Sequence, residues 1–156
     1  PNIQPDLDSY PYVLERQLRP EARVDMVKRF AEMNLIPSSM IDISDGLASE
    51  VMHLCEESML GCSIYEEKIP IDPQTVTVAE LFNMHPVTCA LNGGEDYELL
   101  FTVSQSDFDK INGKGEFYII GHMTEAGSEK NLITNTGEAI PITAQGWDGM
   151  KKDERK

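Results

Sequence analysis

Two glycines followed by a run of acidic residues constrain this chain more than any other feature. Residues 91–102 read Leu-Asn-Gly-Gly-Glu-Asp-Tyr-Glu-Leu-Leu-Phe-Thr, so Gly93 and Gly94 lead through three carboxylates into apolar, strand-like sequence. Glycine permits close backbone approach and conformations that other residues avoid, and the adjacent acids can bind a metal or a polar substrate. We predict a ligand-binding loop at the entrance of a strand. A tight hairpin with solvated acids is the alternative that this segment alone leaves open.

A second acidic cluster, Asp-Ile-Ser-Asp-Gly, occupies residues 42–46. Polar and apolar residues alternate over 40–44, which predicts a short strand, whereas residues 47–55 carry apolar side chains at helical spacing. The acids therefore lie where a strand leads into a helix. Free backbone N–H groups at a helix start favour phosphate, and nearby carboxylates can hold the magnesium that accompanies it. Taken singly, Ser44 or Asp45 could equally be a helix cap.

Acidity is the main feature of the composition, with 27 Asp and Glu against 13 Lys and Arg and a formal net charge of −14. Binding to nucleic acid needs a basic surface, so we exclude nucleic acid as a partner. A phosphate ligand would also be repelled unless divalent cations mediate. The charge thus fits a magnesium–nucleotide site, although a solvated acidic surface accounts for most of it.

Length and apolar content bound the organisation of the chain. At 156 residues and 40% hydrophobic content it can bury one core, so we expect one domain. It has no apolar run near 18 residues and no signal-peptide layout, which excludes a membrane span and leaves secretion unsupported. Cys55, Cys62 and Cys89 lack metal-type spacing and are expected to be free thiols in a reducing cytoplasm. Because the chain starts at Pro1, we expect a processed or cut piece.

The local patterns predict an α+β fold in which helices pack on a mixed β-sheet. A first helix is expected after Pro20, with its apolar stripe formed by Val24, Val27, Phe30, Ala31 and Met33. The other expected helices cover residues 46–58, 73–84 and 106–111. The expected strands cover residues 42–45, 63–69, 87–91, 98–103 and 117–122, and a hairpin over 132–142 turns at Asn135-Thr136-Gly137.

The clusters at 42–47 and 93–99 together resemble the C-terminal half of thiamine-monophosphate kinase, in the superfamily of aminoimidazole ribonucleotide synthetase. Residues 18–24 resemble the Pro/Arg-rich start of that half, and Gln145-Gly146-Trp147-Asp148 resembles its closing segment. The resemblance implies a linker or N-terminal extension over 1–17, a C-terminal domain over 18–150 and a charged tail over 151–156. It also implies helices packed on a mixed sheet.

The family's enzyme transfers the γ-phosphoryl group of ATP onto thiamine monophosphate, giving thiamine diphosphate and ADP. By resemblance, Asp42 and Asp45 match magnesium ligands, and Ser44 matches a nucleotide contact. Glu95 matches a substrate contact, and Trp147 matches the aromatic position beside the thiamine. The implied cofactor is Mg²⁺, with ATP as co-substrate, and no catalytic side chain is assigned. Carboxylate oxygens suit magnesium, and an indole face suits a cationic ring.

In the family, the N-terminal half supplies the remaining magnesium ligands, much of the nucleotide site and the central barrel of a dimer. We therefore expect a cytoplasmic, homodimeric kinase at full length and negligible turnover from this chain alone. Ala22 stands where the family often has proline, so Arg19 and Arg23 stay unassigned, as do Asp96 and Glu98. Gly149-Met150 stands where the family commonly has His-Phe, which leaves that wall of the substrate pocket open.

Two alternatives remain. Another ATP-using member of the superfamily, such as selenophosphate synthetase, would share the domain but act on a different substrate. The chain could also be a non-catalytic ligand-binding module that keeps the loops. The combination of Gly-Gly-Glu-Asp-Tyr-Glu-Leu with Gly-Trp-Asp favours the thiamine enzyme.

Overall fold

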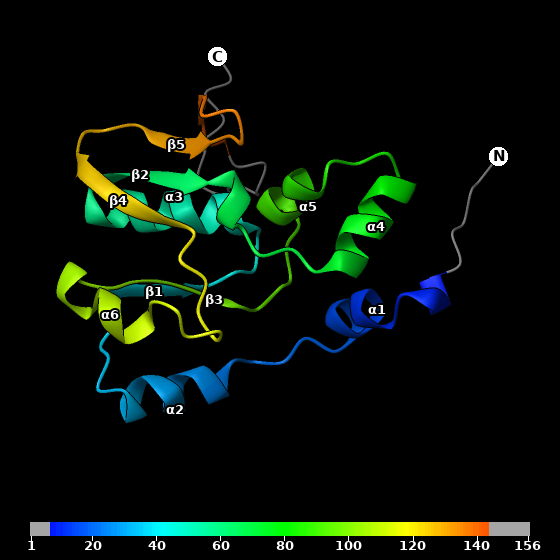
Figure 1. Ribbon diagram of the computed structural model, residues 1–156, viewed down its shortest axis with the longest axis horizontal. Coiled ribbons are helices and arrows are strands. Elements are labelled where there is room, and N and C mark those ends of the chain that lie inside the picture. Colours follow the sequence, from blue (N-terminus) through cyan, green and yellow to red (C-terminus); the bar gives the residue numbers. More distant parts are fainter. Residues whose placement is uncertain (1–6, 144–156) are drawn as a thin grey trace, which may run out of the picture.

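The computed structural model describes residues 7–143 (Figure 1). Its helices are α1 (Pro11–Leu18), α2 (Val24–Glu32), α3 (Leu47–Ser58), α4 (Pro73–Leu81), α5 (Pro86–Asn92) and α6 (Phe108–Ile111), with short 3₁₀ turns η1 (Leu7–Ser9), η2 (Glu66–Lys68) and η3 (Gln105–Asp107). Its strands are β1 (Ser39–Asp42), β2 (Leu60–Tyr65), β3 (Leu99–Thr102), β4 (Gly121–Ala126), β5 (Lys130–Ile133) and β6 (Ala139–Pro141).

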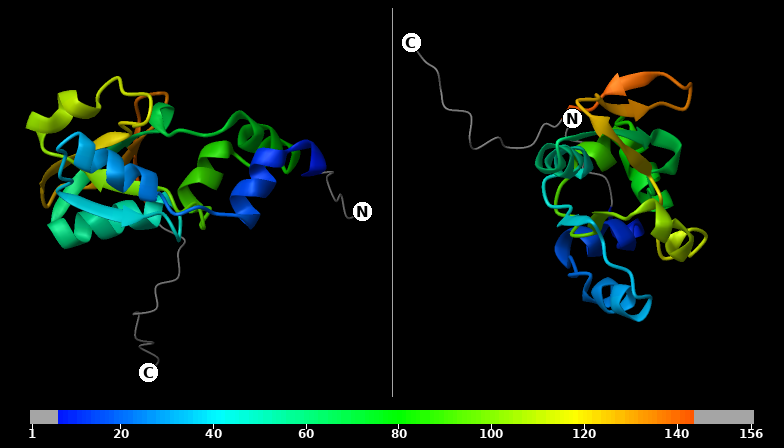
Figure 2. Two further views of the ribbon diagram at one scale, coloured as in Figure 1. Left: turned by 90° about the horizontal axis from the view of Figure 1, so that it is seen from below. Right: turned by 90° about the vertical axis from the view of Figure 1, so that its left-hand side faces the viewer.

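The strands form two sheets. The larger has the order β4-β2-β5-β6, in which β2 runs antiparallel to β4 and parallel to β5, and β6 returns antiparallel to β5. The smaller sheet is the antiparallel pair β1-β3. Figure 1 shows this pair between the larger sheet and α2, and Figure 2 shows the same layers end-on. The predicted α+β fold with a mixed sheet is confirmed, and so is the hairpin over 132–142.

Helix α3 packs its apolar face against the larger sheet. Leu47, Val51 and Cys55 recur at helical spacing and are buried together with Cys62 and Ile64 of β2. The thiols of Cys55 and Cys62 are free, as predicted. Burial, followed by the hydrogen bond with Cys55, raises the pKa of Cys62 to about 12. Such a thiol stays protonated at neutral pH and behaves as a core residue.

Strand β3 is covered on both faces, which fixes its register. Side chains alternate along a strand, and Leu100 accordingly packs into the α3 core. Leu99 and Phe101 face the opposite way, into a second core around Phe30 of α2. The rings of Phe30 and Phe101 meet edge to face with centroids 5.0 Å apart, and Phe117 joins them. A slip of one residue would exchange the two sets, so the entrance of β3 is held firmly in place.

The structure corrects one predicted strand. Residues 87–91 were predicted to be extended but lie in helix α5. Pro86 occupies the first turn, where its fixed φ favours a helix and its missing N–H costs nothing. A short apolar run does not distinguish a strand from a buried helical turn by its periodicity. The glycine loop (residues 93–98) therefore connects a helix to a strand and is not a hairpin turn.

Other boundaries shift. Helix α2 begins at Val24 rather than beside Pro20, and it buries Met26 and Phe30 while Val24 and Val27 are about half exposed. Strand β2 ends at Tyr65, where η2 takes over the remainder of the predicted 63–69 strand. Strand β4 begins four residues later than predicted, at Gly121. The strand predicted over 42–45 lies three residues earlier, as β1.

A helix must be both long and apolar to cross a lipid bilayer. Within residues 7–143, no helix meets both requirements.

Candidate functional site

The two acidic clusters, about fifty residues apart in the sequence, meet at the open end of the β1-β3 pair. Beyond the last paired strand residues, the backbone of Ile43 donates a hydrogen bond to the carbonyl of Glu98 (2.8 Å) and accepts one from Tyr97 (2.9 Å). The N–H of Glu95 then donates to the carbonyl of Ser44 (2.8 Å). The strand-to-helix junction and the glycine loop are thus joined backbone to backbone.

Two glycines make this close approach possible. Gly46 has φ +114°, and a Cβ there would lie 2.8 Å from the carbonyl oxygen of Leu91. A Cβ on Gly94 would lie 2.4 Å from the carbonyl oxygen of Ser44. Both positions therefore exclude any side chain. The glycine of each cluster packs on the backbone of the other, which explains why both are needed for one site.

Asp42 and Asp45 lie at the two ends of the strand-to-helix junction. Asp42 ends β1 and Asp45 precedes α3, and both residues are exposed. Within the described part of the chain, neither carboxylate takes part in an ion pair. Two unpaired carboxylates at the start of a twelve-residue helix offer hard oxygen ligands beside free backbone N–H groups.

Glu50 is a buried carboxylate directly beneath this turn. It lies in the first turn of α3 and is 2% exposed. Its Oε1 accepts a hydrogen bond from the backbone N–H of Asp45 (3.0 Å). Its Oε2 accepts none from the residues that the structure describes. The side chain therefore acts like the acid of a capping box, reaching back to fix the residue before the helix.

The glycine loop carries two unusual backbone conformations. Glu95 has φ +66° and Tyr97 has φ +53°, although neither is glycine. Non-glycine residues in the left-handed region cost about 1–3 kcal/mol each and persist only where their surroundings hold them. Here the holding contacts include the hydrogen bonds of both amides to Ser44 and Ile43. Such strain is typical of ligand-binding loops.

An arginine network lies on the other side of the glycine loop. Arg16 of α1 pairs with Glu98 Oε1 (2.7 Å) and also donates to the carbonyl of Asp96 (2.9 Å). Arg23 pairs with the other oxygen of Glu98. Gln17 donates to Glu95 Oε2 (3.0 Å). Part of the predicted extension over 1–17 is therefore a helix in contact with the site, while the domain division itself stays a prediction.

Asp96 has a perturbed carboxyl group. Loss of hydration raises its pKa, the positive charge of Arg16 opposes this shift, and the negative charge of Glu98 adds to it. Asp96 is nevertheless exposed to solvent. The ionised form of Asp96 is less favourable here than in free solution.

An open pocket of about 430 Å³ lies next to Asp42. It is lined by Pro20, Ala22, Arg23, Asp42, Tyr97 and Leu99. The pocket thus joins the end of β1, the glycine loop and the segment that leads into α2. It places a guanidinium and an unpaired carboxylate around one space.

The structure brings four of the five predicted site residues together: Asp42, Ser44, Asp45 and Glu95 lie on the two joined segments. The fifth, Trp147, lies outside the described residues. Within residues 7–143, no group of three or more His, Cys, Asp or Glu side chains could hold a metal ion. The carboxylates of Asp42 and Asp45 have the chemistry that magnesium prefers, but they are not part of such a group.

Sequence reasoning missed Arg16, Gln17 and Glu50. The acid in the first helical turn after Gly46 was a signal for Glu50, because such acids commonly cap helices. For α1, the signal was Pro11 at the first helical position. The sequence near α1 gives no sign of its contact with the glycine loop, since about eighty residues separate the partners.

Comparisons with known proteins bear on this site. The thiamine-monophosphate kinase of Aquifex aeolicus is 39% identical over 90 residues, which cover 58% of this chain and 28% of that protein. The enzyme of Pyrococcus horikoshii is 30% identical over 141 residues, covering 90% of this chain and 42% of that protein. A solved structure, AaThiL complexed with AMPPCP and TMP, superposes with a TM-score of 0.66 at 31% identity and covers 82% of this chain and 38% of its own.

The chain is a homologue of thiamine-monophosphate kinase over a domain-sized region. This match to the thiamine-monophosphate kinases spans less than half of their length. The fold is also shared with the hydrogenase maturation protein HypE, in a structure solved with ATP (TM-score 0.60 at 15% identity, covering 76% of this chain and 39% of that one). No protein-family model matches the sequence.

Proposed function

We propose that this chain is the C-terminal part of a thiamine-monophosphate kinase and carries one side of its magnesium–nucleotide and substrate site. The full-length enzyme would transfer the γ-phosphoryl group of ATP to thiamine monophosphate and release thiamine diphosphate and ADP. The observation that carries the proposal is the direct backbone contact of Ser44 with Glu95, which joins the two clusters shared with this family. The relative solved with AMPPCP and TMP supports it.

Asp42 and Asp45 would hold Mg²⁺ through their unpaired carboxylates. When bound, the ion would neutralise phosphate charge and so reduce the repulsion between two anionic reactants. Ser44 would contact the nucleotide beside the start of α3, where backbone N–H groups favour phosphate. In this proposal the described residues bind and orient the reactants, and no side chain serves as a nucleophile.

Glu95 would contact the thiamine end of the substrate. Gln17 occupies only Oε2 of its carboxylate, so its charge remains available to a cationic ring. Trp147 is proposed as the aromatic neighbour of that ring. The pocket is lined by one proposed metal ligand, Asp42, and by Tyr97 of the glycine loop.

We propose that the remaining metal ligands come from an N-terminal half like that of the longer relatives, since the match covers 42% of one of them. We also propose that this half forms the dimer. We therefore expect negligible turnover from this chain alone. We propose that the full-length enzyme is cytoplasmic. That residues 7–143 hold no group of three or more possible metal ligands favours the second candidate, a non-catalytic ligand-binding module. Another ATP-using enzyme of the superfamily, such as selenophosphate synthetase, would share the nucleotide contacts but not the role of Glu95.

Calorimetric titration of this chain with AMPPCP, with and without Mg²⁺, tests the proposed function. We expect weak binding that requires Mg²⁺ and is lost in Asp42→Asn and Asp45→Asn. The matched control is Asp109→Asn, which removes an exposed carboxylate from α6, away from the site. Binding without Mg²⁺, or binding unchanged in both site variants, would contradict the proposal. Thiamine diphosphate formation at the rate of a complete kinase would contradict the expected inactivity.

A further inference from the structure

We propose that helix α1 is a positioning element of the site, in which Arg16 and Gln17 hold the glycine loop and set the direction of the Glu95 carboxylate. The inference rests on the proposed function only for the role of Glu95 as a substrate contact. It concerns a segment that the sequence assigned to a linker.

The two α1 residues contact three positions of the glycine loop. Arg16 Nη2 donates to the carbonyl of Asp96 (2.9 Å) and to Glu98 Oε1 (2.7 Å). Gln17 Nε2 donates to Glu95 Oε2 (3.0 Å). Two consecutive helical residues therefore hold both the backbone and the acidic side chains of the loop. Hydrogen bonds between a guanidinium and a carboxylate are among the stronger ones in proteins.

These contacts complement those on the inner side of the loop. The amides of Glu95 and Tyr97, the two residues with positive φ, donate to the β1 end of the junction. Arg16 binds the carbonyl of Asp96, the residue between them, from the outside. The strained segment is thus held from both sides. Removal of the Arg16 contact leaves the amides of Glu95 and Tyr97 with fewer side-chain contacts to oppose relaxation of the two left-handed residues.

The carboxylates of Glu95 and Glu98 differ in whether a positive charge compensates them. Glu98 is shared by Arg16 and Arg23, so its charge is compensated by two guanidinium groups. Glu95 is held by a neutral amide, and its Oε1 has no partner among the described residues. An amide fixes the direction of a carboxylate without neutralising it. Glu95 therefore keeps the negative charge that a cationic ligand requires.

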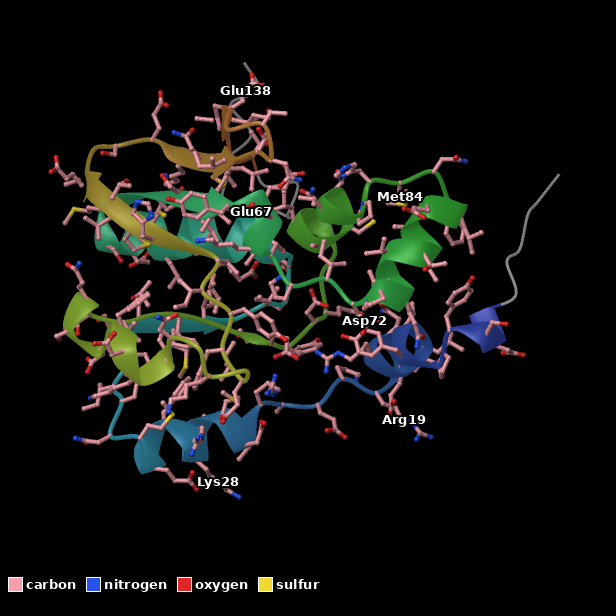
Figure 3. The ribbon with its side chains drawn as sticks, viewed as in Figure 1. Arg19, Lys28, Glu67, Asp72, Met84 and Glu138 are labelled. Carbon is pink, nitrogen blue, oxygen red and sulfur yellow. The ribbon has the colours of Figure 1, made fainter. Side chains whose placement is uncertain are left out.

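Helix α1 is itself anchored, which makes it suitable as a support. It packs beside α4, as Figure 1 and the left view of Figure 2 show. The N–H of Tyr12, in the first turn of α1, donates to Gln74 Oε1 of α4 (3.1 Å). Asp72 caps α4 through the N–H of Gln74 (2.8 Å) and lies between the two helices in Figure 3. Hydrogen bonds to α4 thus hold α1 in place, and α1 in turn holds the glycine loop.

Hydrogen exchange at the amides of Glu95 and Tyr97 tests the inference in the whole chain. We expect Arg16→Ala to speed exchange at both amides by about tenfold, because one charged hydrogen-bond network is lost. The matched control is Arg19→Ala, which removes the same charge from the end of α1. Arg19 points away from the molecule in Figure 3. Unchanged exchange in Arg16→Ala, or an equal change in Arg19→Ala, would overturn the inference.

A ligand titration separates this inference from the proposed function. Gln17→Leu keeps the size of the side chain but removes the amide that orients Glu95. If the unaltered chain binds thiamine monophosphate, we expect Gln17→Leu to weaken binding about tenfold, the loss expected for one such hydrogen bond. Equal affinity would overturn the positioning role of Gln17. Faster exchange in Arg16→Ala, combined with no binding of thiamine monophosphate by the unaltered chain, would support α1 as the support of the loop and contradict a substrate contact by Glu95 in this chain alone.

Discussion

Gly94 packs on the backbone of Ser44 so closely that a Cβ would stand 2.4 Å from the serine carbonyl oxygen. Real Cβ atoms do not approach backbone oxygens to this distance, so even alanine must displace one of the two segments. The contact joins the glycine loop to the strand-to-helix junction. It makes the geometry of each cluster depend on the other.

Replacement of Gly94 by alanine should therefore destabilise the fold. We expect Gly94→Ala to lower the free energy of unfolding by about 1–3 kcal/mol, as overpacking against rigid neighbours does. Urea denaturation measures the change. Gly115→Ala is the control, since a Cβ there would meet no atom within 4 Å, and we expect a change within about 0.5 kcal/mol. Equal stability of the two variants would contradict the close contact.

Glu50 should stabilise the junction through its hydrogen bond with the N–H of Asp45. Glu50→Ala removes this acceptor and leaves space in a buried site, so we expect a loss of about 1–3 kcal/mol in the free energy of unfolding. Glu50→Gln keeps an acceptor oxygen and should lose less. The control is Glu57→Ala, an exposed acid of the same helix. A loss in Glu57→Ala as large as that in Glu50→Ala would exclude a specific role for Glu50.

The buried face of α2 is tested by two neighbouring residues. Met26 is 8% exposed and Val27 is 51% exposed, although the sequence pattern placed Val27 in the apolar stripe. We expect Met26→Ala to cost about 2–5 kcal/mol and Val27→Ala no more than about 0.5 kcal/mol. Thermal and urea denaturation provide the measurement. The reverse order would mean that the helix is rotated relative to β3.

Asp96 should contribute a pH-dependent term to stability. Its pKa is raised in the folded state by loss of hydration and by Glu98, against the opposing effect of Arg16. A carboxyl whose folded pKa is raised destabilises the fold when ionised, and this penalty disappears as pH falls through the folded pKa. We expect Asp96→Asn to be more stable than the unaltered chain at pH 7, by a margin that shrinks towards pH 4. The effect should be small because the residue is exposed. A pH-independent margin in urea denaturation would refute this.

The sequence predicted the fold well where a single local pattern was decisive. Helix α3, with apolar residues at helical spacing after a glycine, and β3, with its hydrophobic run, were both placed within a residue of their observed bounds. The strand predicted over 87–91 was wrong because a short apolar run suits both a strand and a buried helical turn. The packing of α5 on α3 and α4 favours the helix. In α2, the buried face differs from the predicted apolar stripe. Phe30 packs on Phe101 of β3, and this contact sets the rotation of the helix.

The site could be predicted only in part for a related reason. Asp42, Ser44, Asp45 and Glu95 stand out because two acidic clusters beside glycines occur in one chain and together resemble a known family. The contacts of Arg16 and Gln17 depend on how α1 folds back over a distant loop, and no spacing in the sequence encodes this. Glu50 was hidden because an acid in a first helical turn is ordinarily exposed, whereas here it is buried.

The pairing of β1 with β3 also sets the order in which the molecule can form. Ser39 faces Thr102 across an intervening stretch of 62 residues that contains α3, β2, α4 and α5. Contacts between such distant positions form late, because the chain must first close a long loop. On a ribosome, the junction at Asp42–Asp45 would stay without its partner until β3 has been synthesised. Acquisition of ligand-binding geometry should therefore be among the last events of folding.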